Sequence, residues 1–153
     1  MKTIKILFVA FVAAASMAFT TSNEIIDASN VSSKKLKEIF EQAFMTVSKE
    51  DPAGNFIAVN DGLDIYIDID PQKRFITYSV DVGVNSGFTE QEVMDLMNLL
   101  STEVLMISPS YDKASKNVWL KYDYWIEGGV TAKSIVATEK QFVAALRLVL
   151  QKD

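Results

Sequence analysis

Three aspartates, Asp64, Asp68 and Asp70, lie close together in the segment 64–70, and their carboxylate oxygens would suit a hard cation such as calcium or magnesium. Their spacing does not reproduce the calcium loop, which has a glycine and a distal glutamate. The segment is also predicted to be a strand rather than a loop that wraps a ligand. We therefore interpret the aspartates as the solvated face of a strand and assign no metal-binding residue.

The same aspartates, or Glu127 with Asp123, could form the carboxylate pair of a glycosidase, which requires two carboxyl groups about 5–10 Å apart in a cleft. Acidic residues are abundant here, so such pairs arise by chance, and the sequence indicates neither a cleft nor a raised pKa. Cysteine and histidine are both absent, which excludes thiol nucleophiles, Ser–His pairs, imidazole zinc sites and disulfides. We assign no catalytic residue and no cofactor, and we expect a protein that is not an enzyme.

Gly128 and Gly129 precede a predicted helix, where free backbone N–H groups attract phosphate. The chain has neither the GxxxxGKS/T pattern nor the GxGxxG pattern of nucleotide-binding loops. We interpret the two glycines as residues that allow a positive φ where a strand turns into a helix.

The candidate interaction surface consists of Trp119, Trp125 and Tyr66, which are predicted to lie on the faces of their strands opposite the aliphatic residues. Large aromatic side chains on the exposed side of a sheet often mark an interface. Two alternatives stay open: a helix or loop covers the tryptophans, or the assignment of the faces is inverted.

The chain is acidic and about half apolar, with 49% hydrophobic residues and a formal net charge of −5. Loss of a leader that holds Lys2 and Lys5 leaves 13 basic against 20 acidic residues, a net charge of −7. Such a surface repels phosphate backbones, so we expect no nucleic-acid partner. No Lys/Arg-rich amphipathic segment supports attachment to anionic lipid.

The N-terminus resembles a secretory leader. Two lysines precede an unbroken apolar run over residues 6–15, and Ser16-Met17-Ala18 puts small residues where a signal peptidase reads. The run is well short of the about 20 residues of a membrane-spanning helix. We predict a bacterial signal peptide over residues 1–18, cleaved after Ala18 or alternatively after Ala15. We therefore expect an exported protein, periplasmic or extracellular, with no membrane anchor after cleavage.

The mature chain is predicted to begin with a flexible segment over residues 19–31 and to continue as a single domain over residues 32–153. Ser32 or Ser33 can cap a first amphipathic helix that ends before Asp51. Its apolar residues are Leu36, Ile39, Phe40, Ala43, Phe44 and Val47. Three strands over residues 55–59, 63–69 and 74–82 follow with short turns, which is typical of an antiparallel meander.

The second half is predicted to contain a helix, two strands and a closing helix. Thr89 and Glu92 have the spacing of a capping box, and the buried stripe of the helix that follows is Val93, Leu96, Met97 and Leu100. Strands are expected over residues 104–108 and 117–126, around a loop over residues 109–116. Thr131 or, alternatively, Thr138 begins the last helix. The predicted fold is α+β, in the order α-β-β-β-α-β-β-α, with a single antiparallel sheet of about five strands and helices packed on one face.

Met97-Asn98, the strand 118–123 and Glu127-Gly128-Gly129-Val130-Thr131 carry a resemblance to a known family. At these positions, and in element order, the chain resembles the YbjN family of proposed bacterial sensory transduction regulators. The resemblance implies a fold similar to that of type III secretion chaperones, and it implies no catalytic or cofactor residues. Members of that family are mostly cytoplasmic, whereas this chain begins with a leader.

The leading functional hypothesis is an exported, non-enzymatic protein-interaction or chaperone-like module that binds another polypeptide or a second copy of itself. The first alternative is a small-ligand sensor in the cell envelope, with a pocket between sheet and helix lined by Tyr78, Tyr122 and Tyr124. The second alternative is a carboxylate-based hydrolase.

Overall fold

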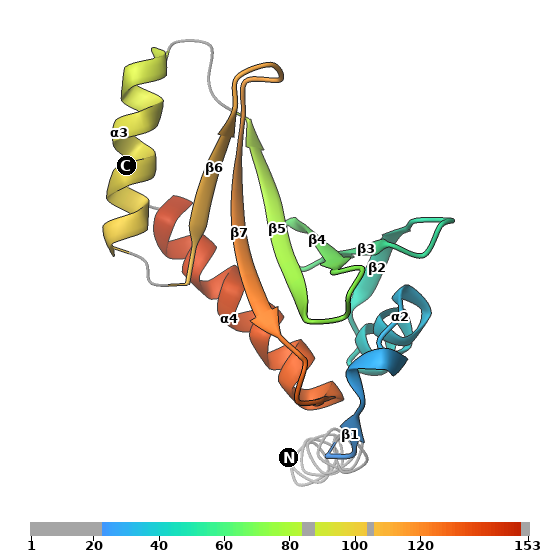
Figure 1. Ribbon diagram of the computed structural model, residues 1–153. Helices are drawn as coiled ribbons and strands as arrows, with labels where there is room; N and C mark the ends of the chain where they lie inside the picture. The colour runs from blue at the N-terminus through green and yellow to red at the C-terminus, as the bar shows by residue number, and fades with distance from the viewer. Residues whose placement is uncertain (1–22, 84–87, 104–105, 151–153) are drawn as a thin grey trace, which may run out of the picture.

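The computed structural model describes residues 23–83, 88–103 and 106–150 (Figure 1). The predicted signal peptide lies outside the described residues, and so do residues 104 and 105 of a predicted strand.

The main sheet has six antiparallel strands in the order β2-β3-β4-β5-β7-β6. Strands β3, β4 and β5 are consecutive and adjacent, so the predicted meander is confirmed. The pairing of β5 with β7 runs from Phe75 opposite Trp125 to Gly83 opposite Asn117 and is the longest in the sheet. The strands are β2 (Thr46–Glu50), β3 (Phe56–Asn60), β4 (Asp64–Ile69), β5 (Phe75–Gly83), β6 (Ser108–Asp112) and β7 (Asn117–Trp125).

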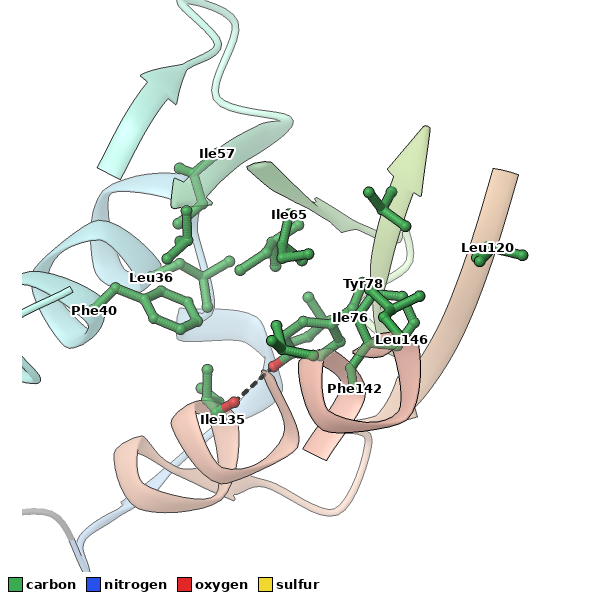
Figure 2. Close-up of a cluster of buried hydrophobic side chains, with 14 of the residues drawn as sticks. Leu36, Phe40, Ile57, Ile65, Ile76, Tyr78, Leu120, Ile135, Phe142 and Leu146 are labelled. Atoms are coloured by element: carbon green, nitrogen blue, oxygen red, sulfur yellow. Dashed lines mark hydrogen bonds between the residues drawn. The ribbon is translucent and has the colours of Figure 1, made fainter. Parts of the chain in front are cut away.

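One face of the sheet carries the hydrophobic core, and helices α2 (Ser33–Gln42) and α4 (Ala132–Leu150) lie on that side (Figure 1). Because successive side chains of a strand point to opposite faces, alternate residues of β4, β5 and β7 enter the core. Figure 2 shows Leu36 and Phe40 of α2 in this core, with Phe142 and Leu146 of α4 close to Tyr78. The opposite face, called the open face below, carries the remaining side chains of the strands.

A second, two-stranded sheet ties the N-terminal segment to the start of α4. Strand β1 (Ile25–Ile26) pairs antiparallel with β8 (Val130–Thr131), and a short 3-10 helix, η1 (Ala28–Asn30), follows β1. Val31 is 1% exposed and belongs to the core. The folded domain therefore begins before residue 32, and residues 25–31, which we expected to be flexible, are part of it.

The sheet has a strand at its edge that sequence patterning missed. The first helix ends at Gln42, with Phe44 at a φ of 59° and 85% exposed, rather than continuing toward Asp51. Val47, assigned to the helix, instead pairs with Val59 in β2. Ala43, Phe44 and Val47 fit a helical period, but β-branched Thr46 and Val47 gain more from pairing with β3. The prediction of a single sheet of about five strands was wrong, because the structure has a six-stranded sheet and a separate two-stranded sheet.

Strand β6 lies about four residues later than predicted. We expected a strand over residues 104–108 and a loop from Pro109, whereas Pro109 and Tyr111 are within β6 and pair with Leu120 and Val118 of β7. Proline is tolerated there because β6 is an edge strand, where a missing N–H breaks no ladder bond.

Helix α3 (Glu90–Glu103) begins as predicted and packs beside β6 (Figure 1). The backbone N–H of Thr89 donates to Glu92 at 2.7 Å, and the N–H of Glu92 donates to the Thr89 hydroxyl at 3.3 Å, which is a capping box. Val93 and Leu100 are buried, but Leu96 is 43% exposed, so its assignment to the buried stripe was wrong.

Candidate functional site

Aromatic side chains from neighbouring strands gather on the open face of the sheet. The predicted faces of β4 and β7 are confirmed. Along each strand, Tyr66 or Trp119 alternates with buried residues that pack in the core, so both rings lie on the open face. The same alternation on β3 and β5 adds two phenylalanines. We call the resulting set the aromatic face: Phe56, Tyr66, Phe75, Trp119 and Trp125.

Two rings of the aromatic face are in contact although a strand lies between the strands that carry them. The rings of Tyr66 in β4 and Trp119 in β7 are edge-on at 6.0 Å between centroids, although β5 runs between them. Ser79 of β5 pairs with Tyr66, and its short side chain, 3% exposed, leaves room for the contact. Phe56 continues the row, 6.1 Å from Tyr66. Tyr66 and Trp119 are therefore fixed by packing while remaining partly exposed.

Trp125 lies at the end of β7 and is 62% exposed. Its indole is 5.5 Å from the ring of Phe75, its partner in β5, in an edge-on arrangement. Covering a large exposed apolar ring with another surface lowers the free energy, because its apolar area is removed from water.

Cations lie over the aromatic face. Lys49 is 5.4 Å from the centroid of Phe56, Lys121 is 5.9 Å from Trp119, and Arg74 is 5.4 Å from Phe75. Cation–π contacts of this kind contribute about 0.5–1 kcal/mol each at exposed sites. They place basic side chains next to the rings of this surface.

The aspartates considered as ligands have separate partners. Asp64 accepts hydrogen bonds from Ser48 at 3.1 Å and from Asn60 at 3.0 Å. Asp70 is bound by the Arg74 guanidinium, with Nε to Oδ2 at 3.0 Å, and this hydrogen bond lowers the pKa of the carboxyl. Within the described part of the chain, no three acidic side chains lie close enough to hold a metal ion together.

Asp68, the third of these aspartates, and Asp123 lie on the open face on either side of Thr77. Partial burial raises the pKa of Asp68, and the nearby Lys121 opposes this rise. Asp123 accepts a hydrogen bond from the Thr77 hydroxyl at 2.6 Å. Glu127 is exposed beyond the end of β7. Asp123 and Glu127 are both exposed, whereas the general acid of a glycosidase lies in a partly buried site within a cleft.

The turn over residues 127–131 has a structural role. Gly129 has a φ of 85°, and a Cβ added to it would lie 2.7 Å from Cγ2 of Ile25 in β1. Thr131 caps α4, since its hydroxyl accepts from the N–H of Ser134 at 3.0 Å and the Ser134 hydroxyl accepts from Thr131 N–H at 3.1 Å. The motif thus holds β1 against β8, and the capping groups occupy the start of α4.

The tyrosines considered as the lining of a ligand pocket lie on the helix side of the sheet. Tyr78 is fully buried, and its hydroxyl donates to the carbonyl oxygen of Ile135 at 3.0 Å, the dashed line in Figure 2. Its ring is 6.4 Å from that of Phe142. Tyr122 and Tyr124 are half-buried against the same core. Tyr78 is accordingly a core residue whose polar group is already bonded.

Sequence patterning missed a buried acid on α4. Glu139 is 0% exposed, and neither of its carboxylate oxygens accepts a hydrogen bond from the described residues. Burial raises its pKa to about 7, with Lys140 and Arg147 opposing and Asp61 reinforcing the rise. Its position between Ile135 and Phe142 on one helical face was the available signal.

Phe56 and Phe75 could have been found by extending the alternation one residue beyond Ile57 and Ile76. Their membership of the aromatic face depends on the pairing register, since Phe75 lies opposite Trp125. Two of the basic residues over the rings, Lys49 of β2 and Arg74 of the turn before β5, come from other segments than most of the rings, whereas Lys121 is on the same face of β7 as Trp119.

No family model matches the chain, and no curated protein matches it in sequence. A search of solved structures found the crystal structure of YbjN from E. coli, described as a suggested transcription regulator, with a TM-score of 0.60. The match has 15% sequence identity and covers 76% of this chain and 86% of that chain. This chain has a YbjN-like fold. The YbjN-like fold was the resemblance expected from Met97-Asn98, the strand 118–123 and the turn 127–131, and it is confirmed. At this identity the likeness concerns the fold alone.

Among the described residues, no helix has the length and apolar character needed to cross a membrane.

Proposed function

We propose that this protein is a non-enzymatic protein-interaction module that binds another polypeptide on the aromatic face of its sheet. The observation that carries the proposal is the position of both tryptophans of the chain on the sheet face opposite α2 and α4, with Trp125 62% exposed. Interface cores are enriched in Tyr, Trp, Phe and Arg, and these residue types make up the aromatic face and its rim.

A polypeptide suits this surface better than a nucleic acid. Aromatic rings and basic side chains also bind single-stranded nucleic acids, but those sites lie in positively charged grooves. Here Asp64, Asp68, Asp81 and Asp123 share the open face with Lys49 and Lys121, and the chain has a net charge of −5. The proposal therefore departs from the transcription role suggested for YbjN, and it keeps only the fold in common.

The site of action that we propose is the periplasm or the extracellular space. Support comes from the leader over residues 1–18, with its lysines, apolar run and small residues. In that setting, a domain without cysteines that exposes a rigid aromatic surface would hold an incoming polypeptide in a chaperone-like manner. A second copy of the chain is the other occupant that the test must distinguish.

The test uses tryptophan fluorescence, because Trp119 and Trp125 are the two tryptophans of the chain and both lie on the aromatic face. The purified mature chain is analysed by light scattering on a sizing column, and any retained polypeptide is identified by mass spectrometry. Trp119→Ala with Trp125→Ala should reduce retention of that polypeptide by at least about 30-fold in affinity, the effect of losing a hot spot of 2 kcal/mol. Binding should also shift the tryptophan emission of the intact protein to shorter wavelength.

The matched control is Phe44→Ala, since Phe44 is 85% exposed and lies on the turn after α2, not on the aromatic face. Circular dichroism must show that all variants are folded. Retention that is equal in the tryptophan and Phe44 variants would exclude the aromatic face as the binding surface. A dimer that dissociates only in the tryptophan variant would identify a second copy as the occupant.

A further inference from the structure

Helix α3 exposes apolar side chains next to its buried face. Val93 and Leu100 are 2% and 7% exposed, whereas Leu96 and Leu99 are 43% and 46% exposed. Helical spacing places positions 92, 95, 96 and 99 in one continuous strip beside the buried one. Phe88, two residues before the helix, adds a ring that is 53% exposed.

The charged residues of this strip are acidic. Glu92 and Asp95 are both exposed, and the segment Glu90–Glu103 contains no lysine or arginine. The N–H and the hydroxyl of Thr89 both donate to the Glu92 carboxylate at 2.7 Å, which lowers the pKa of Glu92. The strip therefore presents two leucines flanked by the carboxylates of Glu92 and Asp95.

The charge of the strip disfavours a second copy as its occupant. A two-fold interface brings the same patch of both molecules together. Since the strip has no basic residue, such pairing would bury carboxylates without counter-charges, which is costly. Leucines between carboxylates are complementary instead to apolar residues between lysines or arginines.

We propose that the strip of α3 formed by Glu92, Asp95, Leu96 and Leu99 docks a basic amphipathic helix of a partner polypeptide. Apolar side chains of the partner, at i, i+3, i+4 and i+7, pack on the two leucines, and its lysines or arginines pair with the two carboxylates. The helix of 14 residues is about 21 Å long, so a partner segment of three to four turns matches it. This surface is on a different element from the aromatic face, and either can fail without the other.

The probe is a synthetic 16-residue helical peptide of leucine, alanine and lysine, with leucines on one face and lysines on its flanks. Its twin has glutamate in place of lysine. Titration calorimetry with the purified mature chain should give saturable 1:1 binding of the basic peptide and none of the acidic twin. Leu96→Ser with Leu99→Ser should weaken binding at least about tenfold, the effect of losing 1.4 kcal/mol.

Charge reversal is the sharper variant. Glu92→Gln preserves the capping box, because glutamine serves in the same position, and Asp95→Lys adds a positive charge to the strip. Together they should lower affinity for the basic peptide at least tenfold and create binding of the acidic twin. Met94→Ser, at a residue 40% exposed on the other flank of the helix, should change neither. Trp119→Ala with Trp125→Ala should also leave peptide binding intact.

Basic-peptide binding that is unchanged in both strip variants, or equal binding of the acidic twin, would overturn the proposal. A dimer of the free protein that dissociates with Leu96→Ser and Leu99→Ser would overturn it as well, because a second copy would then cover the strip.

Discussion

Tyr66 and Trp119 touch across a strand that separates them, with ring centroids 6.0 Å apart above Ser79 of β5. Edge-on aromatic pairs are worth about 0.5–1.5 kcal/mol beyond the area they bury. This contact makes three strands of the sheet present one fixed aromatic surface rather than separate side chains.

A double-mutant cycle with Tyr66→Ala and Trp119→Ala should give a coupling free energy of about 0.5–1.5 kcal/mol in urea unfolding, because either substitution alone removes the contact between the two rings. The same cycle with Tyr66→Ala and Trp125→Ala serves as the control, since Trp125 contacts Phe75 and should not couple to Tyr66. Coupling indistinguishable from the control would show that the rings do not hold each other.

Gly129→Ala should destabilise the fold by about 1–3 kcal/mol, because Gly129 has a φ of 85° and its new Cβ would meet Ile25 at 2.7 Å. Thermal unfolding of this variant is compared with that of Gly128→Ala. Gly128 has no positive φ, and a Cβ added there meets nothing within 4 Å, so its substitution should be near neutral. Equal effects of the two substitutions would contradict the close approach of β1 to the turn.

Glu139 should make the fold less stable as pH rises. Its pKa is raised to about 7 from the 4.5 of an unperturbed glutamate, so the native state binds the proton more tightly than the unfolded state does. The associated stability is complete below pH 4.5 and is lost as pH rises through 7. The groups that act on Glu139 are Lys140 and Arg147 of α4 and Asp61 of the β3–β4 turn.

The change in the free energy of unfolding caused by Glu139→Gln should therefore be about 2–3 kcal/mol more stabilising at pH 8 than at pH 4.5. Urea unfolding at both pH values measures the difference, with exposed Glu41→Gln as the control. A difference between Glu139→Gln and wild type that does not change with pH would mean that Glu139 is ionised at an ordinary pKa in the folded protein.

Tyr78→Phe should cost about 1 kcal/mol of unfolding free energy, because it removes the hydroxyl that donates to the Ile135 carbonyl and leaves the ring packing in place. The midpoint of urea unfolding should fall while the slope stays constant. A neutral substitution would show that this hydrogen bond contributes no net stability.

Strong local signals predicted much of this fold. The alternation in residues 63–69 and 117–126 identified β4 and β7 and assigned Trp119 and Trp125 to the correct face. The Thr89 and Glu92 spacing located the start of α3. These signals are properties of one segment and depend little on tertiary contacts.

The errors occur where long-range pairing decides the structure. Val47 fits the helical period of α2, yet it pairs with Val59 in β2. Pro109 indicates a turn but lies in an edge strand, where it pairs with Leu120. Ile25 and Ile26 form a strand by pairing with β8, which lies more than 100 residues later in the chain. The contact of Tyr66 with Trp119 also depends on the order of strands, which no local pattern contains.

Site-specific photo-crosslinking tests the central claim, binding of a polypeptide on the aromatic face, most directly. A benzoylphenylalanine replaces either Trp125 or Phe44, both exposed, and cells that express the full chain are irradiated. The proposed function predicts discrete crosslinked products from position 125 that are larger than one chain, that Trp119→Ala reduces and that position 44 does not yield. Absence of such products at position 125, or the same products at both positions, would contradict it.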